Sequence, residues 1–334
     1  MSALSGLERT AARLAGALAS RGGRHGSLLV LTYHRVLLEP DPLLPGEPDV
    51  VEFSAQMDML AGVFSIIGLP EARERLVRRS LPPRAMCITF DDGYANNCEV
   101  ALPVLRERGI PATVFVTTGF LNGGRMFNDT VIEAIRRAGA ELDLTSLGLG
   151  RHVLPDVAAR RRTIDQVLPA IKHLDPEERH ARAERIAEIV GAPLPDDLMM
   201  TDEQVRKLAD EGVEIGAHTV RHPVLTRVTP ERARFELVES RRRLQAITGR
   251  SVTTFAYPNG RPVSDYDASH VALVRESGFE LAVSTAPGAA SPPCDLFQIP
   301  RTSPWGGVSL RTALRLALSF RERDYPCVTT EGPG

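Results

Sequence analysis

The sequence is poor in the features that mark several common functional classes. Among 334 residues there are only five tyrosines and one tryptophan, which argues against an extended platform for stacking nucleic-acid bases. The formal net charge is -2 at pH 7, so there is no basic field to bind phosphate backbones without regard to sequence. We therefore expect no nucleic-acid partner.

Paired cysteines and long apolar runs are also missing. The four cysteines are spread along the chain without a CxxC pair, which favours reduced thiols in a cytoplasmic protein. No run approaches the roughly 18 apolar residues that a transmembrane helix requires. The first 24 residues contain arginines but no continuous apolar segment, so we expect no secretory signal.

Residues 1–25 nevertheless have an apolar face at helical spacing. The face consists of Leu4, Leu7, Ala11, Leu14 and Leu18. This pattern predicts an amphipathic helix that docks on the rest of the molecule. The alternative is a weak membrane-surface helix, assisted by Arg9, Arg13, Arg21 and Arg24.

Residues 26–334 alternate between apolar runs and helical periods. With 43% hydrophobic residues, the chain can bury a large core. We predict strands at 27–33, 85–90, 110–117, 213–217, 252–257 and 280–285, and helices at 52–64, 97–108, 203–211 and 230–248. This alternation predicts a parallel α/β fold. From about 128 to 198 the apolar residues recur only at helical spacing, which indicates an inserted helical subdomain.

Two adjacent carboxylates, Asp91 and Asp92, follow the predicted strand at 85–90. Carboxylates at the end of a buried strand are costly unless a metal or a reaction requires them. Neighbouring residues on an extended chain point in different directions, so one can bind a metal while the other faces a substrate. Other predicted strands also end in polar residues, at His34, His218 and Tyr257, and the carboxyl ends of parallel strands share one face.

His218 and His222 form an HxxxH pair directly after another predicted strand. Histidines four residues apart meet on one face of a helical turn, and neutral imidazoles at that spacing bind Zn²⁺ or a similar ion. An isolated HxxxH pair is weak support for a metal site, but a carboxylate pair ends a neighbouring strand. Two imidazoles and one carboxylate leave coordination positions open, as in catalytic rather than structural sites.

Three segments together resemble the motifs of the polysaccharide deacetylase family, the NodB-homology carbohydrate esterases. They are Thr89-Phe-Asp-Asp-Gly93, His218-Thr-Val-Arg-His222 and Phe255-Ala-Tyr-Pro-Asn-Gly260. The matching parts span about 28–120 and 199–305. The segment Leu31-Thr-Tyr-His-Arg-Val36 is similar to the subgroup that acts on exopolysaccharides such as poly-N-acetylglucosamine. This resemblance implies a distorted (β/α)7-type barrel that is circularly permuted.

The resemblance also implies roles for individual residues. Asp91 would be the general base, and Asp92, His218 and His222 would hold a divalent metal. Zn²⁺ is the expected ion, with Co²⁺ or Ni²⁺ as alternatives for the same ligands. The backbone N–H of Asn259 would stabilise the oxyanion. His34 is assigned as general acid, as in the permuted subgroup, because no histidine after His270 exists.

One family position differs in this sequence. The arginine that orients the base aspartate in many members is replaced by Ala256. Arg301 or Arg35 could take its place, and we favour Arg301 because it follows an apolar, strand-like run. A surface ion pair is the alternative for Arg301. The expected substrate contacts are Tyr257, Pro258, Trp305 and Tyr94, although Trp305 could equally fill the core.

These observations predict a metal-dependent N-deacetylase that releases acetate from an N-acetylated poly- or oligosaccharide. Two alternatives remain open: an amidohydrolase for small ureides or imides on the same fold, and a non-catalytic carbohydrate-binding module. A cytoplasmic location with peripheral contact to a membrane or to a polysaccharide-synthesis complex is the expected setting.

Overall fold

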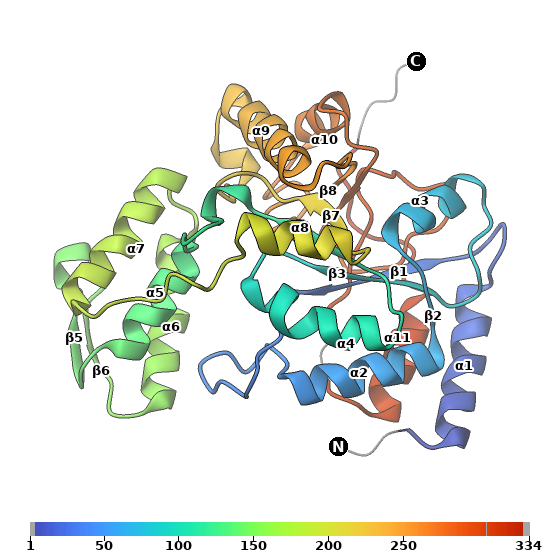
Figure 1. Cartoon of the computed structure of the whole chain (residues 1–334), viewed down its shortest axis with the longest axis horizontal. Coiled ribbons are helices and arrows are strands. Elements are labelled where there is room, and N and C mark those ends of the chain that lie inside the picture. The colour runs from blue at the N-terminus through green and yellow to red at the C-terminus, as the bar shows by residue number, and fades with distance from the viewer. Residues whose placement is uncertain (1–3, 305, 330–334) are drawn as a thin grey trace.

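The computed structural model describes residues 4–304 and 306–329. Its centre is a curled sheet in which every strand pairing is parallel (Figure 1). The strands run in the order β1 (Leu28–Tyr33), β3 (Ala85–Phe90), β4 (Ala112–Val116), β7 (Glu214–Ala217), β8 (Thr254–Ala256) and β9 (Leu281–Val283), and β2 (Ser65–Ile66) also pairs with β3. The predicted α/β architecture is therefore confirmed.

Strand β3 lies within the sheet and is buried along its whole length. Its register with β1 runs from Leu28 opposite Ala85 to Tyr33 opposite Phe90. A strand covered on both faces needs a continuous apolar run rather than an alternating one, and 85–90 has that composition. Because β1 and β3 end in register, the residues that follow them, His34 and Asp91, leave the sheet side by side.

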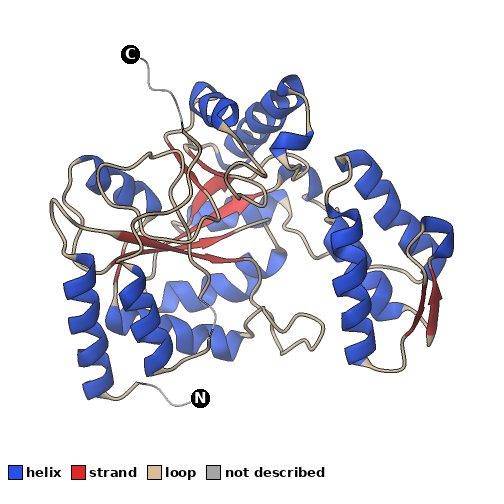
Figure 2. Ribbon diagram, turned by 180° about the vertical axis from the view of Figure 1, so that it is seen from behind, coloured by secondary structure: helices blue, strands red, loops and turns tan. Residues whose placement is uncertain are grey.

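Helices cover the outer surface of the sheet (Figure 2). They are α1 (Gly6–Ser20), α2 (Val50–Val63), α3 (Leu69–Val77), α4 (Leu102–Glu107), α8 (Asp202–Asp210), α9 (Pro230–Thr248), α10 (Ala268–Glu276) and α11 (Leu310–Ser319). Side chains of Asp49, Thr201 and Thr229 cap the N-termini of α2, α8 and α9. These caps satisfy backbone N–H groups that a first helical turn leaves free.

Residues 299–302 close the curled sheet. Ile299 bridges to Val283 of β9, and Thr302 bridges to Leu31 of β1. The Thr302 N–H donates to the Val30 carbonyl at 2.8 Å. This short segment connects the two ends of the sheet and carries Arg301 into the molecule. The result is a distorted barrel, whereas its circular permutation stays a prediction.

Helix α1 packs on α11 through a different face from the one predicted to dock. The buried positions are Ala12, Gly16 and Ala19. Of the predicted leucine face, Leu4 is buried, whereas Leu7, Leu14 and Leu18 are 86%, 62% and 75% accessible. Small residues allow the two helices to approach closely, because a Cβ at Gly16 would lie 3.6 Å from the Ala317 Cβ. The predicted docking face is therefore wrong for Leu7, Leu14 and Leu18 and holds only for Leu4.

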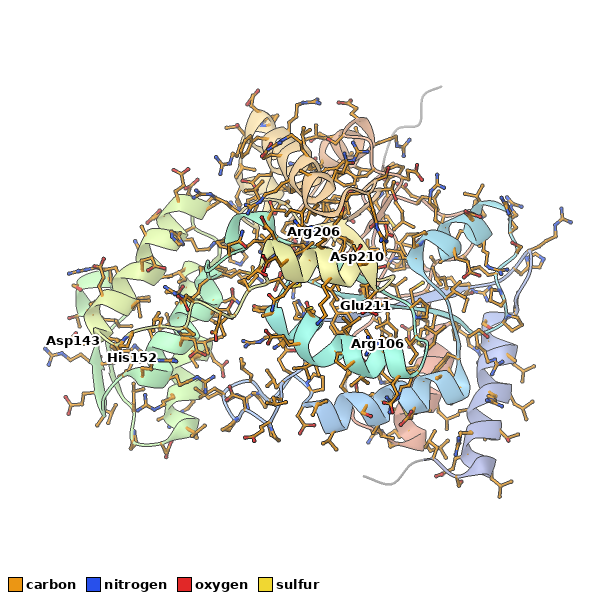
Figure 3. All side chains as sticks on the ribbon, in the orientation of Figure 1. Arg106, Asp143, His152, Arg206, Asp210 and Glu211 are labelled. Carbon is orange, nitrogen blue, oxygen red and sulfur yellow. The ribbon has the colours of Figure 1, made fainter. Side chains whose placement is uncertain are left out.

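The helical insert stands to one side of the sheet, at the left of Figure 1. It contains α5 (Phe127–Arg137), α6 (Val157–Lys172) and α7 (Pro176–Val190), which pack around a core of their own that includes Val131, Ile164 and Ile186. A two-stranded hairpin, β5 (Glu141–Asp143) and β6 (Arg151–Val153), was not expected from the sequence. Figure 3 shows Asp143 and His152 on this hairpin at the outer end of the insert.

Candidate active site

A cavity of about 450 Å³ opens where the strands end. Seven predicted site residues line it: His34, Asp91, Asp92, Tyr94, His218, His222 and Asn259. They follow β1, β3, β7 and β8, as expected for the shared carboxyl edge of a parallel sheet. The insert supplies another wall through Met126, Phe127, Asn128, Leu168, Pro169 and Lys172.

Asp92, His218 and His222 converge on one point of this cavity. Their ligand atoms all lie within 4.8 Å of one another. The two Nε2 atoms are 3.1 Å apart, and Asp92 Oδ1 lies 3.5 Å from the first and 3.6 Å from the second. His218 Nδ1 lies 2.7 Å from the Ala256 carbonyl oxygen, so Nδ1–H donates there and Nε2 faces the cluster.

The donor set fits a divalent metal ion. Asp92 Oδ1 is buried without a hydrogen-bond partner. Burial lowers the pKa of His222 to about 3, which keeps that imidazole neutral and able to ligate. A carbonyl acceptor on the other nitrogen of a metal-binding histidine is a common outer-shell partner, and His218 has one.

The two histidines do not lie on a helical turn, contrary to the sequence-based expectation. Thr219 and His222 have φ angles of 68° and 52°, so the segment is an irregular loop. Buried Glu236 of α9 holds this loop, because one of its carboxylate oxygens accepts the N–H groups of Val220 and Arg221 at 2.8 Å. The two rings, four residues apart, therefore meet through an irregular loop and not through a helical turn.

Arg179 of α7 connects the insert to the histidine loop. It is 3% exposed, and its Nη2–H donates to the His222 carbonyl at 2.9 Å. Its guanidinium also lies 4.3 Å from the centre of the Phe127 ring, a cation–π contact. Burial lowers the pKa of Arg179 to about 10, which still leaves it charged at neutral pH. Neither Arg179 nor Glu236 was predicted as part of the site, because neither belongs to a sequence motif.

Asp91 forms a buried, two-point ion pair with Arg301. The Nη1–Oδ1 and Nη2–Oδ2 distances are 2.7 and 2.6 Å, and the Arg301 Nε–H donates to the Ser284 carbonyl at 2.9 Å. Burial by itself would raise the pKa of Asp91, but the Arg301 charge outweighs it and holds that pKa below its ordinary value. Asp91 is therefore ionised at neutral pH.

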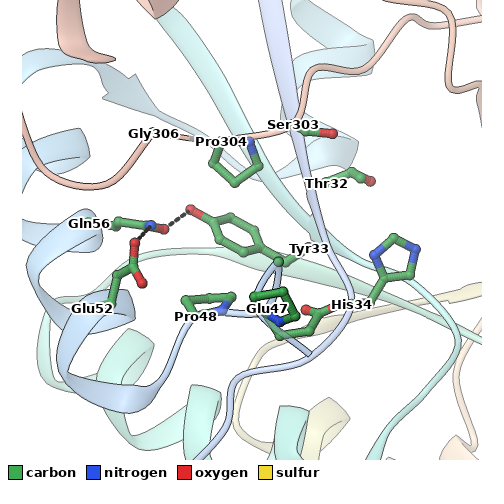
Figure 4. Close-up of a pocket in the computed structure, with 12 residues that line it drawn as sticks. Thr32, Tyr33, His34, Glu47, Pro48, Glu52, Gln56, Ser303, Pro304 and Gly306 are labelled. Atoms are coloured by element: carbon green, nitrogen blue, oxygen red, sulfur yellow. Dashed lines mark hydrogen bonds between the residues drawn. The ribbon is translucent and has the colours of Figure 1, made fainter. Parts of the chain in front are cut away.

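His34 lies between the cavity and a smaller pocket beside it, drawn in Figure 4. Glu47 lines both spaces with it. Burial raises the pKa of Glu47, although the nearby His34 and Arg35 charges act against the rise. On the other side of this pocket the Tyr33 hydroxyl donates to Gln56 at 2.9 Å. His34 and Glu47 thus lie together at the boundary between the two pockets.

Asn259 and Tyr94 complete the lining in different ways. Asn259 has a φ of 58°, and its backbone N–H finds no acceptor among the described residues. The Tyr94 hydroxyl donates to Asp129 of α5 at 3.1 Å, and Arg35 lies 3.6 Å from the same carboxylate. Burial raises the pKa of Asp129 to about 7. This polar network joins the insert to the barrel below the cavity.

Two of the expected substrate contacts, Tyr257 and Pro258, do not line the cavity. Tyr257 is 1% exposed, and its ring stacks on Tyr266 at 3.9 Å in the core, so no face is free for a sugar. Pro258 is also buried. Trp305 lies outside the described residues, while its neighbours Pro304 and Gly306 line the smaller pocket.

Comparison with known families identifies the class of protein. The polysaccharide deacetylase family model matches residues 78–282, which is more than half of the chain. The chain therefore belongs to the polysaccharide deacetylase family. Members are metal-dependent hydrolases that act on the N-acetyl groups of polysaccharides, and the Asp-His-His cluster provides a candidate metal site in this chain.

Individual relatives are more distant. The Bacillus subtilis (strain 168) protein YxkH, provisionally named a polysaccharide deacetylase, is 22% identical over 284 residues, covering 84% of this chain and 73% of that protein. The Streptococcus pyogenes deacetylase PplD, solved with acetate, has a TM-score of 0.59 at 18% identity and covers 88% of this chain and 99% of its own. IcaB from Ammonifex degensii has a TM-score of 0.56 at 21% identity and covers 87% and 97%. At these identities the structures confirm the fold.

Within the described residues, no helix has the length and apolar character needed to cross a membrane.

Proposed function

We propose that this chain hydrolyses the acetamide of an N-acetylated amino sugar in a poly- or oligosaccharide and releases acetate. The observation that supports this most is the composition of one cavity. It holds an ionised, arginine-bound carboxylate, an Asp-His-His cluster and a further histidine. Amide hydrolysis needs these three components: a base for water, an electrophile for the carbonyl oxygen, and an acid for the leaving amine.

Asp92, His218 and His222 would hold the metal. Zn²⁺ is the proposed ion, because imidazole and carboxylate groups are its usual ligands, and Co²⁺ or Ni²⁺ can occupy the same ligands. When bound, the ion supplies Lewis acidity that polarises the carbonyl and lowers the pKa of a water molecule. The His218–Ala256 hydrogen bond fixes the ring so that Nε2 is presented. Arg179 and Glu236 keep the loop that carries both histidines in place.

Asp91 is the proposed general base. A base must be ionised and within reach of the proton that it removes. Arg301 keeps Asp91 ionised despite its burial and, by holding both oxygens, fixes the direction of the carboxylate. Arg301 therefore positions the base in place of the arginine that the third motif lacks.

His34 is the proposed general acid, and it follows β1, whereas His218 follows β7 at the same edge of the sheet. As the carbon–nitrogen bond breaks, its imidazolium gives a proton to the departing amine. The neighbouring carboxyl groups of Asp91, Asp92 and Glu47 all interact electrostatically with His34. The Asn259 N–H, without an acceptor in the described structure, is the proposed donor to the oxyanion.

Acetate release tests the proposal. Full-length protein loaded with Zn²⁺ should release acetate from N-acetylglucosamine oligomers, and chelation should abolish the activity until metal is returned. Activity on hydantoin or a similar cyclic imide, together with no activity on acetylated sugars, would replace this proposal by an amidohydrolase of small molecules.

A further inference from the structure

The composition of the chain makes one cavity residue unusual. Lys172 and Lys207 are the only lysines among 40 basic residues, the rest being arginines. Lys172 is the last residue of α6, in the insert, and it lines the same cavity as Asp91 and His222. One of two lysines in the whole chain therefore faces the site of the proposed chemistry.

Lys172 has no anionic partner within the described residues. Every ion pair there uses arginine or histidine as the cation, and the half-buried Lys172 ammonium makes neither an ion pair nor a hydrogen bond. The charge of Asp265 attracts the Lys172 ammonium without forming an ion pair with it. One Asp265 oxygen already accepts the Arg261 N–H at 2.9 Å. A cation that loses water without gaining a partner is unfavourable.

The surroundings of Lys172 add positive charge. Burial lowers the pKa of its ammonium, and the charges of Arg261 and Arg179 lower it further. The other acidic side chains of the cavity have partners: Arg301 pairs with Asp91, two imidazoles face Asp92, and the Arg35 N–H donates to Glu47. The wall formed by the end of α6 is thus the part of the cavity suited to an anion.

We infer that Lys172 forms an anion-binding subsite, which binds a carboxylate or phosphate group on the glycan beside the N-acetylated sugar. This inference rests on the proposed function and names a substrate class for it: anionic glycans rather than uncharged ones. Lysine binds such groups as a compact charge with three rotatable donors. A sugar hydroxyl would satisfy one donor but would leave the charge unpaired.

Chemical labelling tests the subsite without requiring turnover. Full-length protein is acylated with an amine-reactive acetate ester, and mass spectrometry of peptides follows Lys172 and Lys207 separately. A hyaluronan tetrasaccharide provides a carboxylate, N,N'-diacetylchitobiose 1-phosphate provides a phosphate, and tetra-N-acetylchitotetraose provides neither. Slower acylation of Lys172 with one or both anionic probes, and no change at Lys207, supports the inference and shows which anion is preferred. Equal effects of all three probes, or none, would overturn it.

Kinetics provides the second measurement. Lys172→Met should raise KM about tenfold for the anionic oligosaccharide that protects Lys172, the size expected for losing a charged hydrogen bond. The KM for tetra-N-acetylchitotetraose should stay unchanged. Lys172→Arg should retain part of the preference, and Lys207→Met should have no effect. If Lys172→Met changes all substrates alike, the subsite is wrong while the deacetylase proposal stands. If wild-type protein deacetylates no sugar, the proposed function fails and the labelling result still decides the subsite.

Discussion

Arg301 and Asp91 are 210 positions apart in the chain, yet they form a two-point ion pair with side chains only 1% and 5% exposed. The pair forms because residues 299–302 bridge β9 and β1 while Asp91 follows β3, the neighbour of β1. The same segment, residues 299–302, therefore closes the barrel and orients the proposed base.

Replacing Arg301 should alter both stability and pH dependence. Arg301→Met leaves a buried carboxylate without a partner, which should cost about 3–5 kcal/mol of unfolding free energy. In the wild type the pKa of Asp91 is depressed, so the base is ionised above that low value. Without Arg301 burial dominates, the pKa rises, and the acid limb of kcat/KM should move to higher pH.

The matched control is Arg275→Met, because Arg275 is 53% exposed and lies 3.8 Å from Asp295. An exposed pair of this kind contributes about 0–1 kcal/mol, so stability should change little. Thermal unfolding and a pH–rate profile measure both effects. An unchanged acid limb in Arg301→Met would show that Arg301 does not set the ionisation of the base.

His34→Gln should lower kcat for an acetylated sugar by about 10²–10⁴-fold, the usual contribution of a general acid. Metal content should not change, since His34 is outside the Asp-His-His cluster. The loss should be much smaller with 4-nitrophenyl acetate, whose leaving group departs without a proton. Equal losses on both substrates would contradict the general-acid role, and His25→Gln on the surface provides the control.

Arg179→Met should weaken metal binding about 10–100-fold, the range found when outer-shell support of a ligand is lost. The reason is that Arg179, on α7 of the insert, donates a hydrogen bond to the carbonyl of His222 in the histidine loop. Competition with a chelator of known affinity measures the change. Arg185→Met on the same helix is the control, because Arg185 is 57% exposed and pairs only with Glu188. Equal metal affinity in both variants would mean that the insert does not support the site.

Gly216→Ala should destabilise the barrel by about 1–3 kcal/mol or more, as overpacking of a core does. A Cβ at Gly216 of β7 would lie 2.3 Å from a ring carbon of Phe115 and 2.7 Å from Thr254 Oγ1. Gly139→Ala is the control, because nothing lies within 4 Å of its Cβ position. Thermal unfolding compares the two variants, and similar midpoints would show that β4 and β7 can move apart.

The sequence predicted the strand framework and the convergence of His34, Asp91 and His218. These residues end apolar runs, and parallel strands bring their carboxyl ends to one edge. Strand 85–90 was located at its exact bounds. The insert was recognised from its helical periods, but the β5–β6 hairpin was not, because its strands are only three residues long and mostly exposed.

The supporting residues could not be predicted from sequence. Arg179 and Glu236 form hydrogen bonds with backbone groups of the histidine loop, which is separate from them in sequence. No motif around either residue indicates these hydrogen bonds. The histidine loop was expected to be helical, but positive φ angles at Thr219 and His222 give another path. Tyr257 was expected to contact the substrate, yet its ring turns into the core against Tyr266.

The most direct test compares Asp91→Asn with Asp92→Asn in a single experiment that measures bound Zn²⁺ and acetate released from an N-acetylglucosamine oligomer. Because the two aspartates have different proposed roles, their variants should differ in metal content. Asp91→Asn should keep one Zn²⁺ per chain and lose activity, whereas Asp92→Asn should lose both. Full activity in Asp91→Asn, or equal metal loss in the two variants, would contradict the assignment of base and ligand on which this account depends.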